Sequence, residues 1–191
     1  VRELCDRHGA LLIFDEIPLA LGRTGRMFCC EHSGVTPDII VLGKGLGGGV
    51  IPMAATITRA DLDIAPQRAL GHYTHEKSPV GAAAALATLD VIESDNLLER
   101  SRKLGAETLE GLRELQRRHD AVIDVRGLGL AMGVKLSSPD ATERVLYDCL
   151  SNGLSFKVSG GTVITLTPPL TITNEQMARA LAILDKALGR L

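Results

Sequence analysis

Two short apolar runs, each ending in a charged side chain, constrain the fold of this chain most strongly. Residues 10–16 read ALLIFDE, and residues 39–44 read IIVLGK. Continuous apolar runs of this length are typical of strands buried on both faces, as in a parallel sheet covered by helices. Functional groups in open α/β sheets gather at the carboxyl ends of strands. We therefore expect Asp15 and Lys44 to lie at one edge of such a sheet, on strands that are neighbours.

The rest of the chain divides into two predicted parts. A third strand is expected over residues 53–58, and a helix with proline in its first turn begins at Pro79. Its small apolar residues suggest a buried helix. From about residue 96 an amphipathic helix is followed by short strands and two further helices. We predict that residues 1–95 belong to an α/β sheet domain and that residues 96–191 form a smaller α+β domain.

Composition and charge argue against several classes of protein. The net charge of −2 disfavours a nucleic-acid surface, which would be basic. No apolar run approaches the roughly 20 residues that a membrane-spanning helix needs. The four cysteines show no disulfide framework and no signal peptide is expected, so we predict a cytoplasmic protein. Because the first residues read as the end of a helix, we expect the C-terminal part of a longer chain.

Lys44 lies among five glycines, and three interpretations compete for it. The first is a surface lysine in a turn. The second is phosphate binding, because residues 43–48 fit GxGxxG, but a strand-like segment follows where a dinucleotide site needs a helix. The third is covalent catalysis through a Schiff base with a carbonyl cofactor such as pyridoxal phosphate (PLP). Asp15 could then pair with the pyridinium nitrogen of the cofactor, and the two residues together favour this third interpretation over a turn acid.

Two stretches carry weak metal-binding patterns. The adjacent Cys29 and Cys30, followed by His32, lack the second cysteine pair of a tetrahedral site. His72 and His75 lack a third ligand at a motif spacing. We predict no metal site.

Several motifs, in order and with matching spacing, resemble class III aminotransferases of the fold type I PLP enzymes. They are LLIFDE, GRTGRMF, CEHSGVTPDIIVLGKGLGGG and PPLTIT, and the resemblance covers essentially the whole chain. It implies an α/β fold: the C-terminal part of the large, mostly parallel sheet domain that binds PLP, plus a small α+β domain. The segment GRTG is interpreted as a structural turn.

The resemblance also assigns roles to individual residues. It implies that Lys44 forms the Schiff base with PLP and that Asp15 pairs with the pyridine nitrogen. It implies that Ile17 packs on the cofactor ring. Thr74 would reach the PLP phosphate across a subunit interface, so the protein is expected to be a homodimer with its active site at that interface.

The chain departs from the family pattern at positions that concern the substrate. Pro18 stands where members usually carry a glutamine that binds the cofactor hydroxyl. Thr165 stands where many amino-acid aminotransferases carry an arginine that clamps the substrate carboxylate. The stretch GHYTHEKSP is also unusual, and its histidines and Lys77 could bind an anionic group such as phosphate or phosphonate, or simply form a solvated or interface loop.

Three hypotheses about function follow. The first is a PLP-dependent aminotransferase that moves an amino group from a small amine or amino acid to a keto-acid acceptor, with Lys44 as the proton-transferring base. The second is a PLP-dependent lyase on the same scaffold, acting on a phosphorylated or phosphonate amine. The third is that this 191-residue stretch is inactive on its own.

Overall fold

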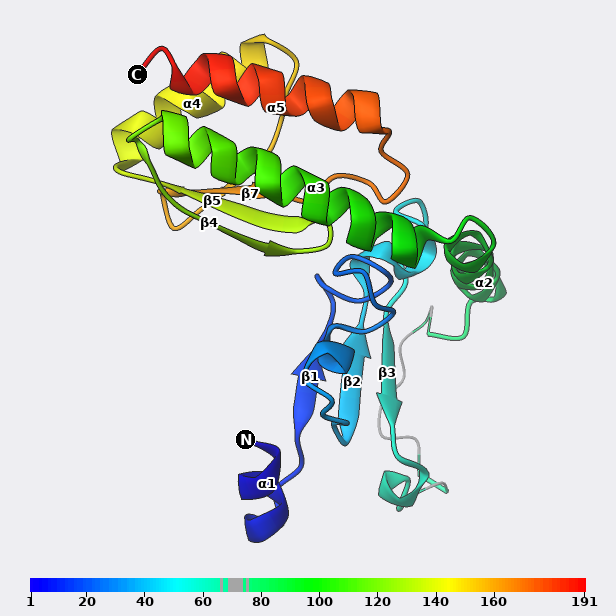
Figure 1. The fold of residues 1–191 in the computed structure, drawn as a ribbon. Coiled ribbons are helices and arrows are strands. Elements are labelled where there is room, and N and C mark those ends of the chain that lie inside the picture. Colours follow the sequence, from blue (N-terminus) through cyan, green and yellow to red (C-terminus); the bar gives the residue numbers. More distant parts are fainter. Residues whose placement is uncertain (66, 69–73, 75) are drawn as a thin grey trace. The chain divides into compact units, whose positions relative to one another are not determined.

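The computed structural model describes residues 1–65, 67–68, 74 and 76–191 (Figure 1). The chain forms two compact units. Unit 1 consists of Val1–Gly22 and Arg26–Asn96, and unit 2 of Arg23–Gly25 and Leu97–Leu191. Within the described part of the chain, none of the helices combines the length and the apolar character that crossing a membrane requires.

Unit 1 is built around a sheet with the strand order β1-β2-β3. The strands β1 and β2 are parallel, with Ile13 opposite Ile39 and Asp15 opposite Val41, so the predicted neighbours are confirmed. The strand β3 runs antiparallel to β2. The bounds of the elements are α1 Arg2–His8, β1 Ile13–Asp15, β2 Ile39–Leu42, β3 Ala55–Thr58, α2 Pro79–Ser94 and the 3₁₀ helices η1 Cys29–His32, η2 Lys44–Gly47 and η3 Ala60–Leu62.

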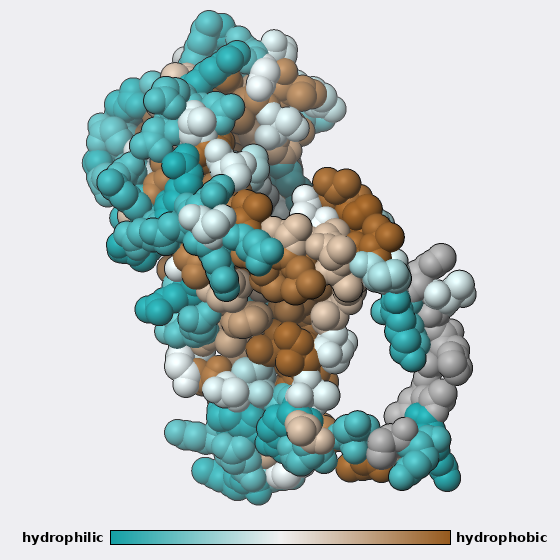
Figure 2. All heavy atoms as spheres, turned by 90° about the vertical axis from the view of Figure 1, so that its right-hand side faces the viewer, coloured by the Kyte–Doolittle hydropathy of each residue, from teal (hydrophilic) through white to brown (hydrophobic). Residues whose placement is uncertain are grey.

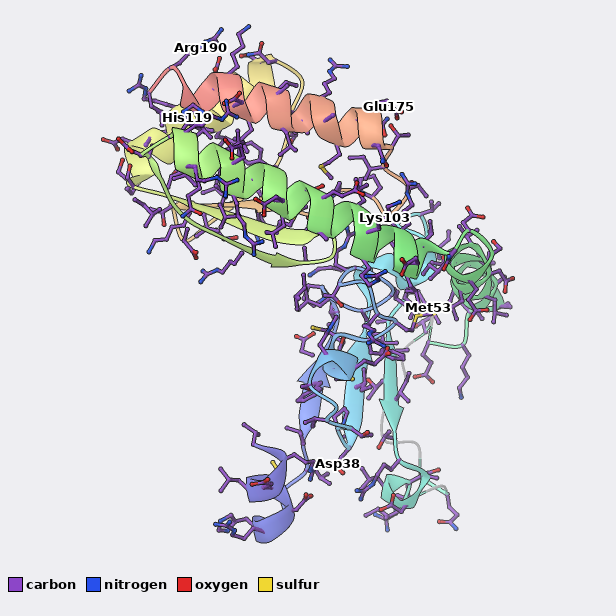
Figure 3. All side chains as sticks on the ribbon, in the orientation of Figure 1. Asp38, Met53, Lys103, His119, Glu175 and Arg190 are labelled. Carbon is purple, nitrogen blue, oxygen red and sulfur yellow. The ribbon has the colours of Figure 1, made fainter. Side chains whose placement is uncertain are left out.

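A buried carboxylate ties together the segments that enter this sheet. Asp38, labelled in Figure 3, precedes β2 and is only 4% exposed. It accepts hydrogen bonds from the Leu12 backbone N–H at 2.7 Å, from Arg2 at 2.8 Å and from Arg59 at 2.6 Å. The Leu12 N–H and the Arg2 guanidinium hold the pKa of Asp38 below its ordinary value. The starts of β1 and β2 are therefore held at one point.

Within this chain, which spans less than half the length of its relatives, the strands of unit 1 are partly exposed, whereas the sequence predicted strands buried on both faces. The side chain of Ile13 in β1 is 56% exposed, and that of Ile57 in β3 is 48% exposed. The reason is that α2 packs mainly against η2, so the described helices of this unit do not cover the sheet. The helix α2 itself was expected to be buried, but only Gly81, Ala85 and Ile92 are buried in it. Figure 2 faces the side that carries α2 and shows apolar residues gathered on the surface.

Unit 2 is a four-stranded antiparallel sheet with the order β4-β5-β7-β6, covered on one face by three helices (Figure 1). Its apolar core lies between the sheet and the helices and includes Leu112, Val145, Ile164 and Leu184, all at most 1% exposed. The opposite face of the sheet is not covered by a helix of this unit. The bounds are α3 Leu97–Arg118, β4 Val122–Leu128, β5 Ala131–Leu136, α4 Pro139–Ser151, β6 Lys157–Ser159, β7 Val163–Leu166 and α5 Asn174–Leu188.

The helices α2, α4 and α5 start where the sequence predicts, because their first turns carry specific capping groups. Ser78 and Ser138 each precede a proline and accept a hydrogen bond from a backbone N–H of the following turn. Thr173 and Gln176 form a reciprocal capping box at the start of α5. These interactions satisfy N–H groups that have no partner within the helix.

Two glycines allow a close backbone approach within unit 2. A side chain on Gly129 would place its Cβ 2.5 Å from the carbonyl carbon of Thr24, and one on Gly105 would lie 2.2 Å from the Gly129 oxygen. The Arg23 carbonyl accepts hydrogen bonds from the Leu130 N–H at 2.9 Å and from the Ser101 hydroxyl at 3.2 Å. Residues 23–25 of the GRTG segment thus have a structural role in this unit.

Candidate active site

Asp15 is the last residue of β1, and its carboxylate is exposed. One carboxylate oxygen accepts a hydrogen bond from the Ile17 backbone N–H at 3.1 Å. This bond fixes the carboxylate at the end of the strand. No ion pair with Asp15 occurs among the described residues, so its charge is available to a ligand.

Lys44 begins η2, two residues beyond the end of β2. Its φ of 48° lies in the left-handed region, which non-glycine residues rarely adopt and which costs of order 1–3 kcal/mol. The side chain is exposed and forms no ion pair with any residue that the structure describes. Non-glycine residues held in such strained backbone conformations cluster at functional sites.

The parallel pairing of β1 and β2 brings Asp15 and Lys44 to the same edge of the sheet, as expected. The carboxyl ends of parallel strands lie at one edge of a sheet. Asp15 is the last residue of β1, and Lys44 follows the end of β2. Ile17 lies beside the Lys44 turn, because a Cβ on Gly43 would be 3.5 Å from one Ile17 side-chain carbon and 3.6 Å from another. Three of the four predicted site residues of this unit, Asp15, Ile17 and Lys44, therefore lie at this edge of the sheet.

The sequence analysis missed Glu16, the residue that secures this strand end. Its side chain is only 3% exposed. The carboxylate accepts hydrogen bonds from the backbone N–H groups of Cys29 at 2.7 Å and Cys30 at 2.6 Å. The signal that could have found it is the strand period of two, because an acid next to an exposed Asp15 must point to the opposite face.

A cavity of about 460 Å³ lies beside Asp15 and is lined by residues of β1 and of the η1 segment. Glu16, Cys29, Cys30 and His32 are among its walls. Burial and the negative charge of Glu16 raise the pKa of the Cys30 thiol, which disfavours a reactive thiolate there. Among the described residues, no group of three potential ligands could hold a metal ion.

The stretch before α2 is described only in part. Thr74 is exposed, and Lys77 lies 3.7 Å from the carboxylate of Glu76. His72 and His75, to which the sequence analysis gave an anion-binding or weak metal-binding role, lie outside the described residues. The predicted role of Thr74 at the phosphate stays a prediction.

Thr165, the residue that replaces the expected arginine, lies on β7 of unit 2. Its hydroxyl is 3.1 Å from the hydroxyl of Ser159 on β6. The two hydroxyls can exchange donor and acceptor roles, but neither carries the positive charge of an arginine. A carboxylate clamp at this position is therefore absent.

Comparison with known proteins settles the family. The family model described as aminotransferase class-III matches residues 1–188. The chain belongs to the class-III aminotransferase family. The family uses PLP, and its members generally act on amine substrates.

Relatives of this class-III chain differ in the reaction named for them. It is 46% identical to the (R)-1-hydroxy-2-aminoethylphosphonate ammonia-lyase of Vibrio splendidus, over 100% of the chain and 42% of that protein. It is 38% identical to the acetylornithine aminotransferase of Caldanaerobacter subterraneus, over 100% of the chain and 48% of that protein. The chain therefore spans less than half the length of these relatives.

Solved structures show the same fold for this class-III chain. The ornithine aminotransferase of Toxoplasma gondii superposes with a TM-score of 0.94 at 33% identity, covering 99% of this chain and 45% of that one. A second structure of that enzyme is described as having partial occupancy of PLP at the active site. The α/β fold is that of the C-terminal portion of fold type I aminotransferases, as predicted.

Proposed function

We propose that this chain is the C-terminal part of a PLP-dependent ammonia-lyase acting on a small hydroxylated amine that carries a phosphonate group. The observation that carries the proposal is the 46% identity to the ammonia-lyase over the whole chain, against 38% for the acetylornithine enzyme. Thr165 supports it, because a substrate without a carboxylate needs no arginine clamp there. We therefore propose the lyase ahead of the aminotransferase, which the sequence analysis favoured.

The residues at the edge of the unit 1 sheet fit PLP. Lys44 has a strained backbone φ, and its exposed ammonium group forms no ion pair with the described residues. Both properties suit a Schiff-base lysine. The Asp15 carboxylate, held by a backbone N–H, suits a partner that keeps a pyridine nitrogen protonated. Ile17, beside the turn, would pack on the ring. When bound, PLP supplies a sink for the electrons that a deprotonated carbon leaves behind.

Lys44 would carry the proton transfers of the reaction. Its Nζ atom would hold PLP and, once free of it, would remove a proton from the carbon that bears the amino group. Loss of the hydroxyl from the neighbouring carbon and hydrolysis then give an aldehyde and ammonia. One water molecule is lost with the hydroxyl and one is consumed in the hydrolysis. The reaction therefore needs no oxidant, no reductant and no keto-acid acceptor.

The proposal also includes a division into two domains and a homodimer. We place residues 1–95 in the large PLP-binding domain and residues 96–191 in the small domain. Thr74 would contact the PLP phosphate of a second subunit, which makes the enzyme a homodimer.

The assay that tests this proposal measures ammonia release from 2-amino-1-hydroxyethylphosphonate without any keto acid. It uses the complete protein, because the chain spans only 42% of the ammonia-lyase. We expect turnover in the wild type and none in Lys44→Ala, with Lys186→Ala as a matched lysine control. Turnover that appears only when a keto acid is added would replace the lyase with the second candidate, an aminotransferase.

A further inference from the structure

Three non-glycine residues in the described part of the chain have a left-handed backbone conformation. They are Leu21, Lys44 and Asn96, with φ values of 60°, 48° and 51°. Asparagine adopts this region more readily than most residues, whereas for a bulky residue such as leucine it is a true outlier. A strained conformation of this kind persists only where the surrounding structure fixes it. The backbone of Leu21 therefore needs an explanation, as that of Lys44 does.

Backbone hydrogen bonds fix Leu21 from two directions. The Ala20 N–H donates to the Glu16 carbonyl at 3.0 Å, which ties this segment to the end of β1. The Leu21 N–H donates to the Met27 carbonyl at 2.6 Å and closes a loop between these two residues. Leu21 is also buried, with an exposed fraction of only 8%. Its side chain is thus held in one place despite the strained φ.

The side chain of Leu21 reaches the turn that carries Lys44. A Cβ on Gly45, the residue after Lys44, would lie 3.7 Å from Leu21 Cδ1, an ordinary van der Waals distance. On the other side of Lys44, a Cβ on Gly43 would lie 3.5 Å from an Ile17 side-chain carbon. The two glycines that flank Lys44 therefore each face a branched side chain from the segment that follows β1. Because glycine restricts its own backbone least, these neighbouring side chains must restrict the turn.

We infer that Leu21 is a positioning residue for Lys44. Its strained backbone places the side chain over Gly45, and this contact holds the Lys44 backbone in its own left-handed conformation. The two strained residues for which this region is most unfavourable thus meet at one turn. Leu21 acts through the backbone of that turn. The inference rests on the proposed function, in which Lys44 is the Schiff-base lysine.

Three variants separate this contact from general stability. Leu21→Gly removes the side chain, and glycine adopts a φ of 60° without strain, so the variant is expected to fold. Leu12→Ala is the matched control, because Leu12 is also 8% exposed but precedes β1, at the opposite edge of the sheet from Lys44. Leu21→Met keeps a side chain of similar volume and should behave as the wild type.

The first measurement is hydrogen exchange over residues 43–48 in the complete protein freed of PLP. The Leu46 and Gly48 N–H groups donate to the Gly43 and Gly45 carbonyls at 3.1 and 2.9 Å, so their exchange reports the order of the turn. We expect both amides to exchange faster in Leu21→Gly than in Leu12→Ala. Equal exchange of the turn in these two variants overturns the positioning role.

The second measurement is the kinetics of ammonia release by the PLP-loaded complete protein. In Leu21→Gly we expect kcat to fall about ten- to hundred-fold, because a small displacement of a catalytic group is costly. The KM should change little, and Leu12→Ala and Leu21→Met should keep the wild-type kcat. An equal kcat in Leu21→Gly and Leu12→Ala would make Leu21 a merely structural residue and overturn the inference.

Failure of the proposed function has a different signature, because the wild type then releases no ammonia. The affinity for PLP, followed by the absorbance of the bound cofactor, takes the place of kcat in that case. It should be weaker in Leu21→Gly than in Leu12→Ala, and equal affinities overturn the positioning of Lys44 by Leu21.

Discussion

The carboxylate of Glu16 accepts a 2.6 Å hydrogen bond from the backbone N–H of Cys30. A second bond of 2.7 Å comes from the N–H of Cys29, and the side chain is only 3% exposed. Glu16 directly follows Asp15, so these two bonds tie the end of β1 to the η1 segment. The direction in which Asp15 projects thus depends on a buried neighbouring side chain.

Replacing this buried acceptor should be costly. In Glu16→Gln, one of the two N–H groups keeps only a neutral acceptor and the other faces the amide NH2, which cannot accept a hydrogen bond. We expect the free energy of unfolding to fall by about 1.5–3 kcal/mol. Urea denaturation of the complete protein measures it. Glu31→Gln is the matched control, because Glu31 accepts one backbone hydrogen bond at 2.7 Å in an exposed position. An equal loss in both variants would contradict the role of burial.

Gly129 should tolerate no side chain. Its φ is 53°, and an added Cβ would lie 2.5 Å from the Thr24 backbone. Gly160 has a similar φ of 56° but open space around it, so Gly160→Ala reports the conformational strain alone. We expect Gly129→Ala to lose at least about 1–3 kcal/mol more than Gly160→Ala, from overpacking. Similar unfolding free energies for the two variants would show that unit 2 can relax around the contact.

Cys149 should be protected from alkylation in the folded protein. Its side chain is fully buried in unit 2, and burial raises its thiol pKa to about 11. Iodoacetamide at pH 8 should therefore label it only when unit 2 unfolds, whereas the partly exposed Cys5 reacts earlier. Mass spectrometry of timed samples distinguishes the two thiols. Labelling of Cys149 at the rate of Cys5 would refute its burial.

The same thiol makes stability depend on alkaline pH. Because the folded pKa is raised, its contribution is fully present below the unfolded thiol pKa of about 8.5 and is lost as pH rises toward 11. We expect Cys149→Ala to remove this part of the alkaline decline. Denaturant midpoints at pH 8, 9.5 and 10.5 give the comparison, and parallel curves for variant and wild type would exclude the effect.

Asp185 should stabilise unit 2 above acidic pH. It lies 2.6 Å from His119, which directly follows α3 and is labelled in Figure 3, and 3.0 Å from Arg118. The hydrogen bond with His119, and then that with Arg118, lower its pKa. Its contribution is therefore present above the unfolded carboxyl pKa of about 3.9 and is lost as pH falls through the folded pKa. Asp185→Asn should lower the melting temperature at pH 7 and approach the wild type near pH 3. A gap that stays constant over this range would argue against the ion pair.

Local sequence signals predicted much of the fold. The strand at residues 39–42 and the helix starts at Pro79 and Asn174 agree with the structure, because apolar runs, prolines and capping residues act within one turn. The family was also predicted, since its motifs span the chain. Asp15 and Lys44 were expected on neighbouring strands, and the parallel pairing of β1 and β2 confirms this placement.

What the sequence did not predict depends on contacts between distant segments. Ile13 is exposed because no described helix of unit 1 covers β1. The apolar run of β1 does not specify which helices pack against it. Glu16 acquires its role from residues 29–30, more than ten positions away. The pairing of Lys157 with Thr165 depends on the register of β6 and β7, and register is fixed by tertiary packing.

The most direct test of the central claim, that Lys44 holds the cofactor, is borohydride reduction of the PLP-loaded complete protein followed by peptide mapping. We predict a single pyridoxyl adduct on Lys44 and loss of the yellow absorbance band in Lys44→Ala. An active enzyme whose reduced adduct lies on another lysine would contradict the account.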